Sequence, residues 1–287
     1  MISNFRKLFA YRKKIWLSIT NLLMISNFRK LFAYRELLYS LTKKELKVKY
    51  RGSVLGFFWS LLNPVLIMLV YSFVFTMVLR QGIKEFAVFL LCALLPFNFF
   101  QNSVNYGAGS VISNANLVKK IYFPKEIIPL SIVLSNLVNF MLELVVLFVV
   151  LSIFRYKFYT YLYLLPLIIV IEVFFVSGIT LLVSSLNVLF RDLQHLVTIL
   201  MLVWFFGTPI IYPLKMVPER FKFWMQLNPM AVFATFYRDI FYYIKYRDDF
   251  YIPDIKIILI CLGITFGVFF LGYFVFKKIE PRFAEEI

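Results

Sequence analysis

The chain has 287 residues, of which 62% are hydrophobic and 16% are charged. Because a soluble globular domain is about half apolar and a quarter charged, this composition excludes most soluble classes. Lys and Arg outnumber Asp and Glu by 31 to 15, a net charge of +16, which in a membrane protein is typical of cytoplasmic segments facing anionic lipid. We therefore expect membrane lipid, and no nucleic acid, as the partner of these cations. The cysteines, Cys92 and Cys261, lie in apolar runs, so we expect neither a disulfide framework nor a thiolate metal site.

The N-terminal segment is basic and partly duplicated. Residues 1–12 read MISNFRKLFAYR, and residues 24–35 repeat them without a change. Because an old structural repeat would have diverged, we interpret residues 1–34 as a duplicated basic leader, with Met24 as an alternative start. In residues 35–52, leucines interleave with lysines as in an amphipathic interface helix on the cytoplasmic face of a membrane. Attraction to lipid and docking of a partner subunit both explain that pattern.

The rest of the chain contains six apolar segments that can each cross a bilayer, which takes about 20 residues of helix. These predicted spans are residues 53–79, 86–106, 127–154, 161–187, 193–211 and 252–276. Thirteen Lys and Arg precede the first span, so the bias of basic residues places both termini in the cytoplasm. We therefore predict a transmembrane domain over residues 53–276 and a cytoplasmic tail over residues 277–287.

The region between the fifth and sixth spans, residues 216–245, contains two shorter apolar stretches separated by Asn228 and Pro229. Pro229 suits the first turn of a new helix, and the second stretch carries Arg238 and Asp239 in its middle. We therefore predict an outer re-entrant helix pair rather than a further span. The predicted fold is an all-α integral membrane protein with six transmembrane helices, an amphipathic cytoplasmic N-terminal helix and this re-entrant pair.

Two carboxylates, Glu143 and Glu172, fall in the middle of the third and fourth predicted spans. A charge at that depth costs about 3 kcal/mol or more, so each residue is a candidate functional site. No Lys or Arg is expected to share their depth. The carboxylates either face a polar pathway or are protonated and hydrogen-bonded to a neighbouring helix, for which the candidate partners are Asn136, Asn139 and Ser177.

The sequence does not indicate a self-contained enzyme. It contains no phosphate-binding loop of the form GxxxxGK[ST], so we expect it not to hydrolyse ATP alone and to hold no cofactor. His195 is the only histidine, and it offers neither a metal site nor a nucleophilic constellation with Ser or Cys.

Aromatic residues make up 20% of the chain. Tyr and Trp gather at membrane interfaces because their rings are amphipathic. Flat rings also stack on sugar rings, so a subset could provide a sliding surface for a glycan. The candidates for such a glycan pathway are Trp59, Tyr71, Phe97, Phe100, Tyr106, Trp204 and Tyr212.

Residues 50–64 read YRGSVLGFFWSLLNP. This pattern resembles the opening of the ABC-2-type permeases that export cell-surface polysaccharides such as O-antigen, capsule and teichoic acid. Three later segments resemble the same family in order and spacing, namely NVLFRD at 187–192, TPIIYP at 208–213 and LNP at 227–229. The resemblance covers roughly residues 35–282 and leaves residues 1–23 outside it.

The resemblance implies a transport subunit rather than an enzyme. Such permeases form homodimers that dock two copies of a separate ATP-binding-cassette subunit, which carries the Mg-ATP. Together they move an undecaprenyl-linked polysaccharide across the bacterial cytoplasmic (inner) membrane. We expect O-antigen as the substrate, with teichoic acid, capsule, or a drug or lipid as alternatives. A membrane-embedded glycosyl- or acyltransferase is the reading from another class, but it would need clustered His, Asp or Glu.

The resemblance also indicates candidate site residues. Those expected to couple to the ATP-binding subunit are Glu45, Lys47, Lys49, Tyr50, Arg51, Asn116, Tyr122 and Lys125. By charge alone, Lys119, Lys120 and Arg51 are expected near the lipid pyrophosphate, although cations that simply follow the positive-inside rule explain each of them at least as well. Those expected to form an outer gate are Trp224, Asn228, Pro229 and Tyr237.

Overall fold

The computed structural model describes residues 33–80, 82–245 and 254–287. The described residues form helices and loops, without a β-strand among them. The first are the interface helix α2 (Arg35–Lys49) and α3 (Trp59–Ser72), which continues as a π-helical turn to Val78. Most of the duplicated leader lies outside the described residues, so its interpretation stays a prediction.

The remaining helices follow in chain order. They are α4 (Phe86–Ala108), α5 (Ser110–Ser113), α6 (Ala115–Lys120), α7 (Ile127–Ile153), α8 (Leu165–Leu189), α9 (Leu193–Phe206), α10 (Glu219–Gln226), α11 (Pro229–Phe241), α12 (Ile255–Ile279) and α13 (Phe283–Glu286). Within the described ranges, five helical segments are long and apolar enough to cross a membrane, and they contain α3, α4, α7, α8 and α12.

The fifth predicted span is shorter than expected. Residues 193–211 were predicted to be one helix, but α9 has 14 residues and ends at Phe206, a length of about 21 Å. Pro209 explains the early end because it lacks an N–H donor and disfavours helical backbone in the residue before it. The TPIIYP segment is therefore irregular backbone that follows a short apolar helix.

The predicted re-entrant region does form two short helices. The break falls where it was predicted, since Asn228 is the N-cap of α11 and Pro229 is its first residue. Helix α11 has 13 residues, about 20 Å of helix, and almost all of its side chains are buried. Helix α10 is amphipathic and more exposed.

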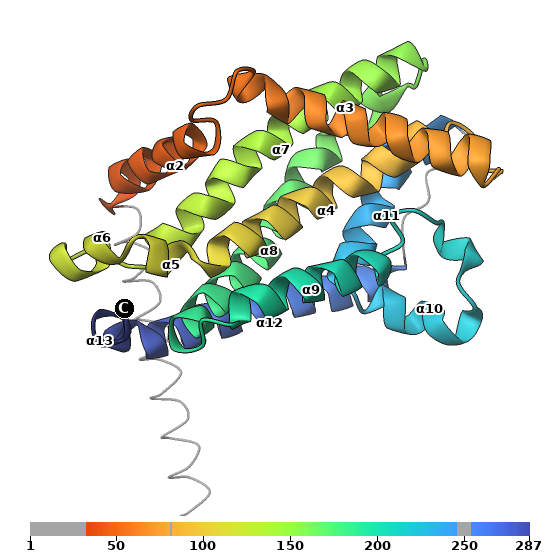
Figure 1. The fold of residues 1–287 in the computed structure, drawn as a ribbon. Helices are drawn as coiled ribbons and strands as arrows, with labels where there is room; N and C mark the ends of the chain where they lie inside the picture. The colour runs from red at the N-terminus through yellow and green to blue at the C-terminus, as the bar shows by residue number, and fades with distance from the viewer. Residues whose placement is uncertain (1–32, 81, 246–253) are drawn as a thin grey trace, which may run out of the picture.

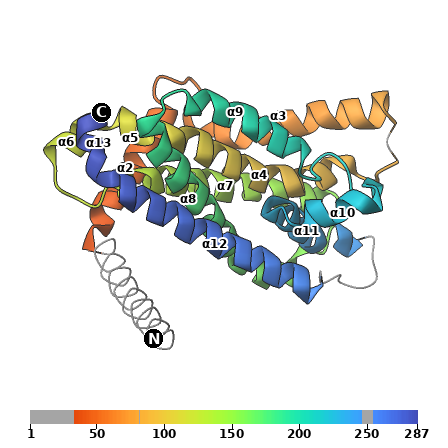
Figure 2. The ribbon, with the colours of Figure 1, turned by 90° about the horizontal axis from the view of Figure 1, so that it is seen from below.

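The helices form an elongated bundle with two distinct ends (Figure 1). Helices α2, α5, α6 and α13 meet at one end, which we call the α6 end, and α10 and α11 lie at the other, the α11 end (Figures 1 and 2). Helix α4 is the most buried span, with 78% of its apolar window inside the protein, whereas for α3 that share is 6%. Helix α4 is therefore the centre of the core, and α3 presents most of its surface outward.

Helix α2 begins at Arg35 as predicted but ends at Lys49, three residues before the predicted end at residue 52. It also does not lie alone on a membrane surface. Its apolar face, with Leu37, Leu38 and Leu41, joins a cluster of hydrophobic residues at the α6 end that includes Ile127 and Phe276. Helix α2 runs beside the first half of α7 (Figure 1). The leucines of an amphipathic helix can bury themselves against protein as well as lipid, and here they pack against protein.

Candidate functional site

The junction of α2 and α7 brings cations and amides together. The Nζ atom of Lys49 lies 3.4 Å from Oδ1 of Asn136, and the hydroxyl of Tyr50 donates a 2.8 Å hydrogen bond to Oδ1 of Asn139. Partial burial raises the pKa of the Tyr50 phenol above its usual value, so this residue stays a neutral hydrogen-bond donor at neutral pH. Tyr50 therefore ties the end of α2 to the middle of α7.

Lys49 also attracts Glu143, which lies further along α7. Lys49 contacts α7 at Asn136, seven residues before Glu143, so the expectation that no basic residue shares the depth of this carboxylate stays a prediction. Asn136 and Asn139 were predicted as partners of the buried carboxylates, but their side-chain oxygens accept from Lys49 and Tyr50 instead. These contacts were not predicted, because the amphipathic pattern of α2 was interpreted as a helix on the membrane surface rather than one packed against α7.

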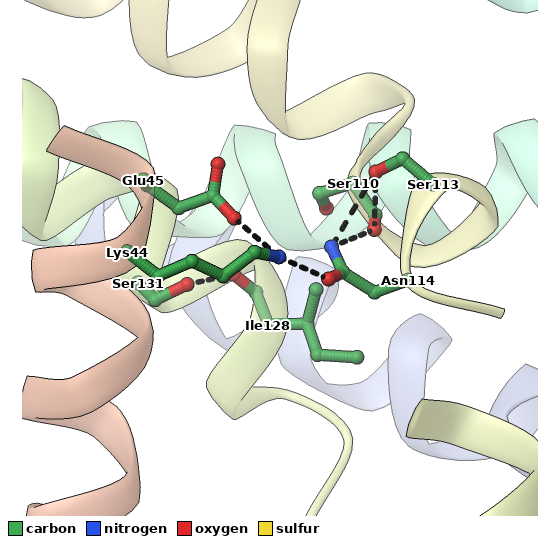
Figure 3. Close-up of polar contacts among 7 residues, drawn as sticks. All are labelled: Lys44, Glu45, Ser110, Ser113, Asn114, Ile128 and Ser131. Carbon is green, nitrogen blue, oxygen red and sulfur yellow. Dashed lines mark hydrogen bonds and ion pairs between the residues drawn. The ribbon is translucent and has the colours of Figure 1, made fainter. Parts of the chain in front are cut away.

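A second polar cluster joins α2 to the loop between α5 and α6 (Figure 3). The ammonium of Lys44 donates to Oδ1 of Asn114 at 2.7 Å and forms a 3.2 Å ion pair with Glu45. The amide of Asn114 in turn donates to the carbonyl of Ser110 at 2.9 Å. Lys44 therefore connects the interface helix to the kinked segment that follows α4.

The candidate residues for lipid pyrophosphate divide between two sites. Lys119, Lys120, Tyr122 and Lys125 line a hollow of about 720 Å³ at the α6 end. Tyr122 is 97% exposed there, and Asn116 is also exposed. Arg51, by contrast, lines a separate hollow on α2 together with Lys43, Lys44 and Lys47. The structure therefore does not group Arg51 with Lys119 and Lys120.

An ion-pair network forms the wall of the hollow at the α6 end. Lys277 lies 2.7 Å from Glu126 and 2.9 Å from Glu280, and the backbone N–H of Lys125 donates to Glu280 at 3.3 Å. Burial raises the pKa of the Glu126 carboxyl above its usual value, and the hydrogen bond from Lys277 partly opposes that rise. This network fixes the loop after α6 against the end of α12.

At the α11 end, Asn228 links two of the sequence motifs. Its Oδ1 accepts hydrogen bonds from the indole of Trp204 at 2.9 Å and from the backbone of Met230 at 3.0 Å. Its Nδ2 donates to the carbonyl of Gly207 at 3.2 Å and to the hydroxyl of Thr208 at 3.0 Å. The LNP and TPIIYP segments are thus held together by one amide.

Arg238 is a candidate functional residue that the sequence analysis did not single out. It was used there only as a charge that argues against a further membrane span. Its guanidinium is buried and donates to the carbonyls of Pro209 and Ile210, and its Nε donates to the carbonyl of Phe89 at 3.1 Å. The guanidinium also lies 3.6 Å from the centre of the Phe89 ring. Arg238 therefore satisfies carbonyls left open where α9 ends. A cation inside an otherwise apolar stretch is the sequence signal for such a site.

Glu172 and Tyr237 meet inside the bundle. The hydroxyl of Tyr237 donates a 2.7 Å hydrogen bond to Oε2 of Glu172, and both side chains are fully buried. The other carboxylate oxygen, Oε1, has no hydrogen-bond partner among the described residues. Tyr237, predicted to be part of an outer gate, is thus buried on α11 and hydrogen-bonded to α8. The gate candidate Trp224, by contrast, is 68% exposed on α10.

The aromatic candidates differ in exposure. Phe97 and Phe100 are fully buried and pack against Phe205 and Trp204, so neither presents a surface to a glycan in this conformation. Trp59 and Tyr106 are exposed, and Tyr71 is partly buried and stacks on Phe75. The hydroxyl of Tyr212 donates to the carbonyl of Phe206 at 2.7 Å. Only an exposed ring can contact a polymer directly.

The comparisons with known proteins agree with this architecture. Residues 36–242 match the family described as ABC-2 type transporter. The chain is 37% identical over 253 residues to the O-antigen export system permease protein RfbA of Myxococcus xanthus, which covers 88% of this chain and 95% of that protein. It is 36% identical to the protein of the same name from Klebsiella pneumoniae, covering 87% and 94%. The polysialic acid transport protein KpsM of Escherichia coli is 23% identical over 66% of this chain and 74% of that protein.

Proposed function

We propose that this chain, which belongs to the ABC-2 type transporter family, exports a lipid-linked O-antigen across the bacterial cytoplasmic membrane. It is a multi-pass membrane protein and the transmembrane subunit of a polysaccharide exporter. The observation that carries the choice of substrate is the 34–37% identity to O-antigen export permeases over nearly their whole length. The weaker similarity to a polysialic acid transport protein supports capsular polysaccharide as the second candidate.

A separate ATP-binding subunit provides the energy in this proposal. The sequence has no phosphate-binding loop of its own. The surface we propose for docking lies at the α6 end, where Tyr122, Lys47 and Asn116 are exposed. In this proposal that end faces the cytoplasm, which agrees with the expected cytoplasmic position of both termini and with the basic residues of α2 and α6.

We further propose that the working unit contains two copies of this chain and two copies of the ATP-binding subunit. The outward apolar surface of α3 and of the π-helical turn after it, including Leu69, Val70 and Phe73, supports contact with a second copy. Closure of the ATP-binding subunits would move α2, and the hydrogen bond between Tyr50 and Asn139 would pass that movement to α7.

Copurification tests whether ATP hydrolysis belongs to a separate subunit that binds this chain. The chain is expressed with a candidate ATP-binding-cassette protein from the same host and is isolated through a tag on the chain. We expect the two proteins to copurify and to hydrolyse ATP together, while the chain alone shows no hydrolysis. Hydrolysis by the chain alone, or failure of the two proteins to associate, would overturn the proposal.

A further inference from the structure

A cleft between α2, the α4–α5 junction and α7 combines several kinds of polar group. Its volume is about 390 Å³, and its lining includes Glu45, Lys49, Tyr106, Ser110, Ser135 and Asn136. That volume lies within the usual range for small-molecule pockets, about 300–1,000 Å³. The cleft is distinct from the hollow that contains Lys119 and Lys120.

Lys49 gives the cleft an accessible positive charge. The side chain of Lys49 is exposed, and its Nζ lies 5.7 Å from the centre of the Tyr106 ring. Two carboxylates are nearby. Glu45 is paired with Lys44 (Figure 3), and Glu143 attracts Lys49 from further along α7. Because the contact of Lys49 with Asn136 is long at 3.4 Å, its ammonium retains donors for an anion.

The other groups in the cleft suit a sugar. The hydroxyls of Ser110 and Ser135 donate to the carbonyls of Gly107 and Ile132, so their oxygens remain available as acceptors. The carboxylate of Glu45 is a further acceptor. Sugar hydroxyls are donors that match these acceptors, and the ring of Tyr106, which is 57% exposed, offers a flat face for stacking against a sugar ring.

The cleft lies at a suitable depth for the head of a lipid-linked glycan. Asn136 is nine residues into α7 from Ile127, so Lys49 meets α7 about 14 Å from the start of that helix. A phosphate bound there would lie along the half of α7 nearer the α6 end, which the proposed function places toward the cytoplasm, and its lipid chain could extend beside the bundle. A lipid that carries both an anion and a sugar therefore fits the place of the cleft along α7 and the polar and aromatic groups that line it.

We infer that this cleft binds the phosphate and the first sugar of the lipid-linked glycan, with Lys49 contacting the phosphate and Tyr106 stacking on the sugar. The inference rests on the proposed function and gives Lys49 a role in substrate binding rather than in coupling. Glu45 and Ser135 accept hydrogen bonds from the sugar. Transport then begins from a substrate held against α2 and α7, the two helices that Tyr50 joins.

Binding by the purified full-length chain tests the inference with two probes. One is a short prenyl diphosphate that carries a single N-acetylhexosamine, and the other is the same prenyl diphosphate without sugar. We expect Lys49→Met to weaken binding of both probes about 10- to 100-fold, as for loss of charge-assisted hydrogen bonds. We expect Tyr106→Leu to weaken only the sugar-bearing probe, by about 2- to 10-fold.

Matched controls come from exposed residues of α2. Lys43→Met and Tyr39→Leu remove the same side-chain types from other parts of that helix, and both should bind the two probes like the wild type. Lys49→Arg keeps the charge and should restore most of the affinity. Size-exclusion profiles that match the wild type would show that each variant is folded.

Three results would overturn the inference. They are equal losses in Lys49→Met and Lys43→Met, no difference between the probes in Tyr106→Leu, and displacement of the sugar-bearing probe by phosphatidylglycerol at similar concentration. The last result would identify a general site for phospholipid headgroups. Export in cells separates the two proposals. If the wild-type gene and Lys49→Met restore export equally to a deletion strain, the cleft assignment fails and the proposed function stands. If the wild-type gene restores no export, the proposed function fails.

Discussion

Gly272 lies at the closest approach between α8 and α12, and Gly272→Ala should therefore destabilise the protein. A Cβ atom placed on Gly272 would lie 2.0 Å from the carbonyl oxygen of Gly178 and 2.9 Å from its carbonyl carbon. Both contacts are with backbone, which cannot move away by changing a rotamer. The reciprocal Cβ on Gly178 would lie 2.6 Å from Cα of Phe269. Only glycine at both positions allows this crossing.

The expected size of the effect follows from overpacking. Forcing extra carbon into a packed site typically costs about 1–3 kcal/mol, and the better helix propensity of alanine returns about 0.5–1 kcal/mol. A net loss of about 1–2 kcal/mol corresponds to a fall in Tm of about 2–8 °C for a protein of this size. Thermal unfolding in detergent, followed by size-exclusion chromatography of the soluble fraction, measures the shift.

Gly267 provides the matched control on the same helix. A Cβ at Gly267 would have no neighbour within 4 Å, so Gly267→Ala should leave Tm unchanged or raise it slightly. Equal Tm values for Gly272→Ala and the wild type would refute the close crossing of α8 and α12. Equal losses in the two variants would show that the effect is not due to this contact.

Three further predictions concern polar contacts. Asn228→Ala removes two acceptor and two donor contacts that join the end of α9 to α11. It should lower the free energy of unfolding by about 2–4 kcal/mol, which is measured as a lower Tm. A Tm equal to that of the wild type would contradict this role. Tyr237→Phe leaves buried Glu172 without its hydrogen bond, which should cost about 1–3 kcal/mol, and thermal unfolding at pH 7 would check it. Burial raises the pKa of Glu126 above the usual 4.5, so the folded protein holds this proton more tightly and stability should fall as pH rises above that value. Glu126→Gln should reduce this slope in unfolding measured across pH, and an unchanged slope would exclude Glu126 as its source.

The sequence predicted elements that depend on length and on local breaks. Long apolar runs identified five helical segments of membrane-crossing length among the described residues, because crossing a bilayer requires a minimum length. The start of α11 was predicted from Asn228 and Pro229, whose effects on the backbone are local. The prediction of the fifth span was too long because its apolar run continued past Pro209, where the helix could not.

The contacts of the candidate sites could be predicted much less well. An amphipathic pattern shows that α2 has an apolar face, but it does not show whether lipid or protein covers that face. The contacts of Lys49 with Asn136 and of Tyr50 with Asn139 therefore required the structure. In the same way, aromatic composition could not separate buried Phe97 from exposed Tyr106.

The fate of the lipid-linked glycan in cells tests the export function most directly. The gene is deleted in its host, and lipid-linked glycan is measured on each face of the cytoplasmic membrane, with and without the restored gene. We expect the glycan to accumulate on the cytoplasmic face and surface polysaccharide to disappear in the deletion strain, and the restored gene to reverse both changes. Normal surface polysaccharide in the deletion strain, without accumulation inside, would contradict the export function.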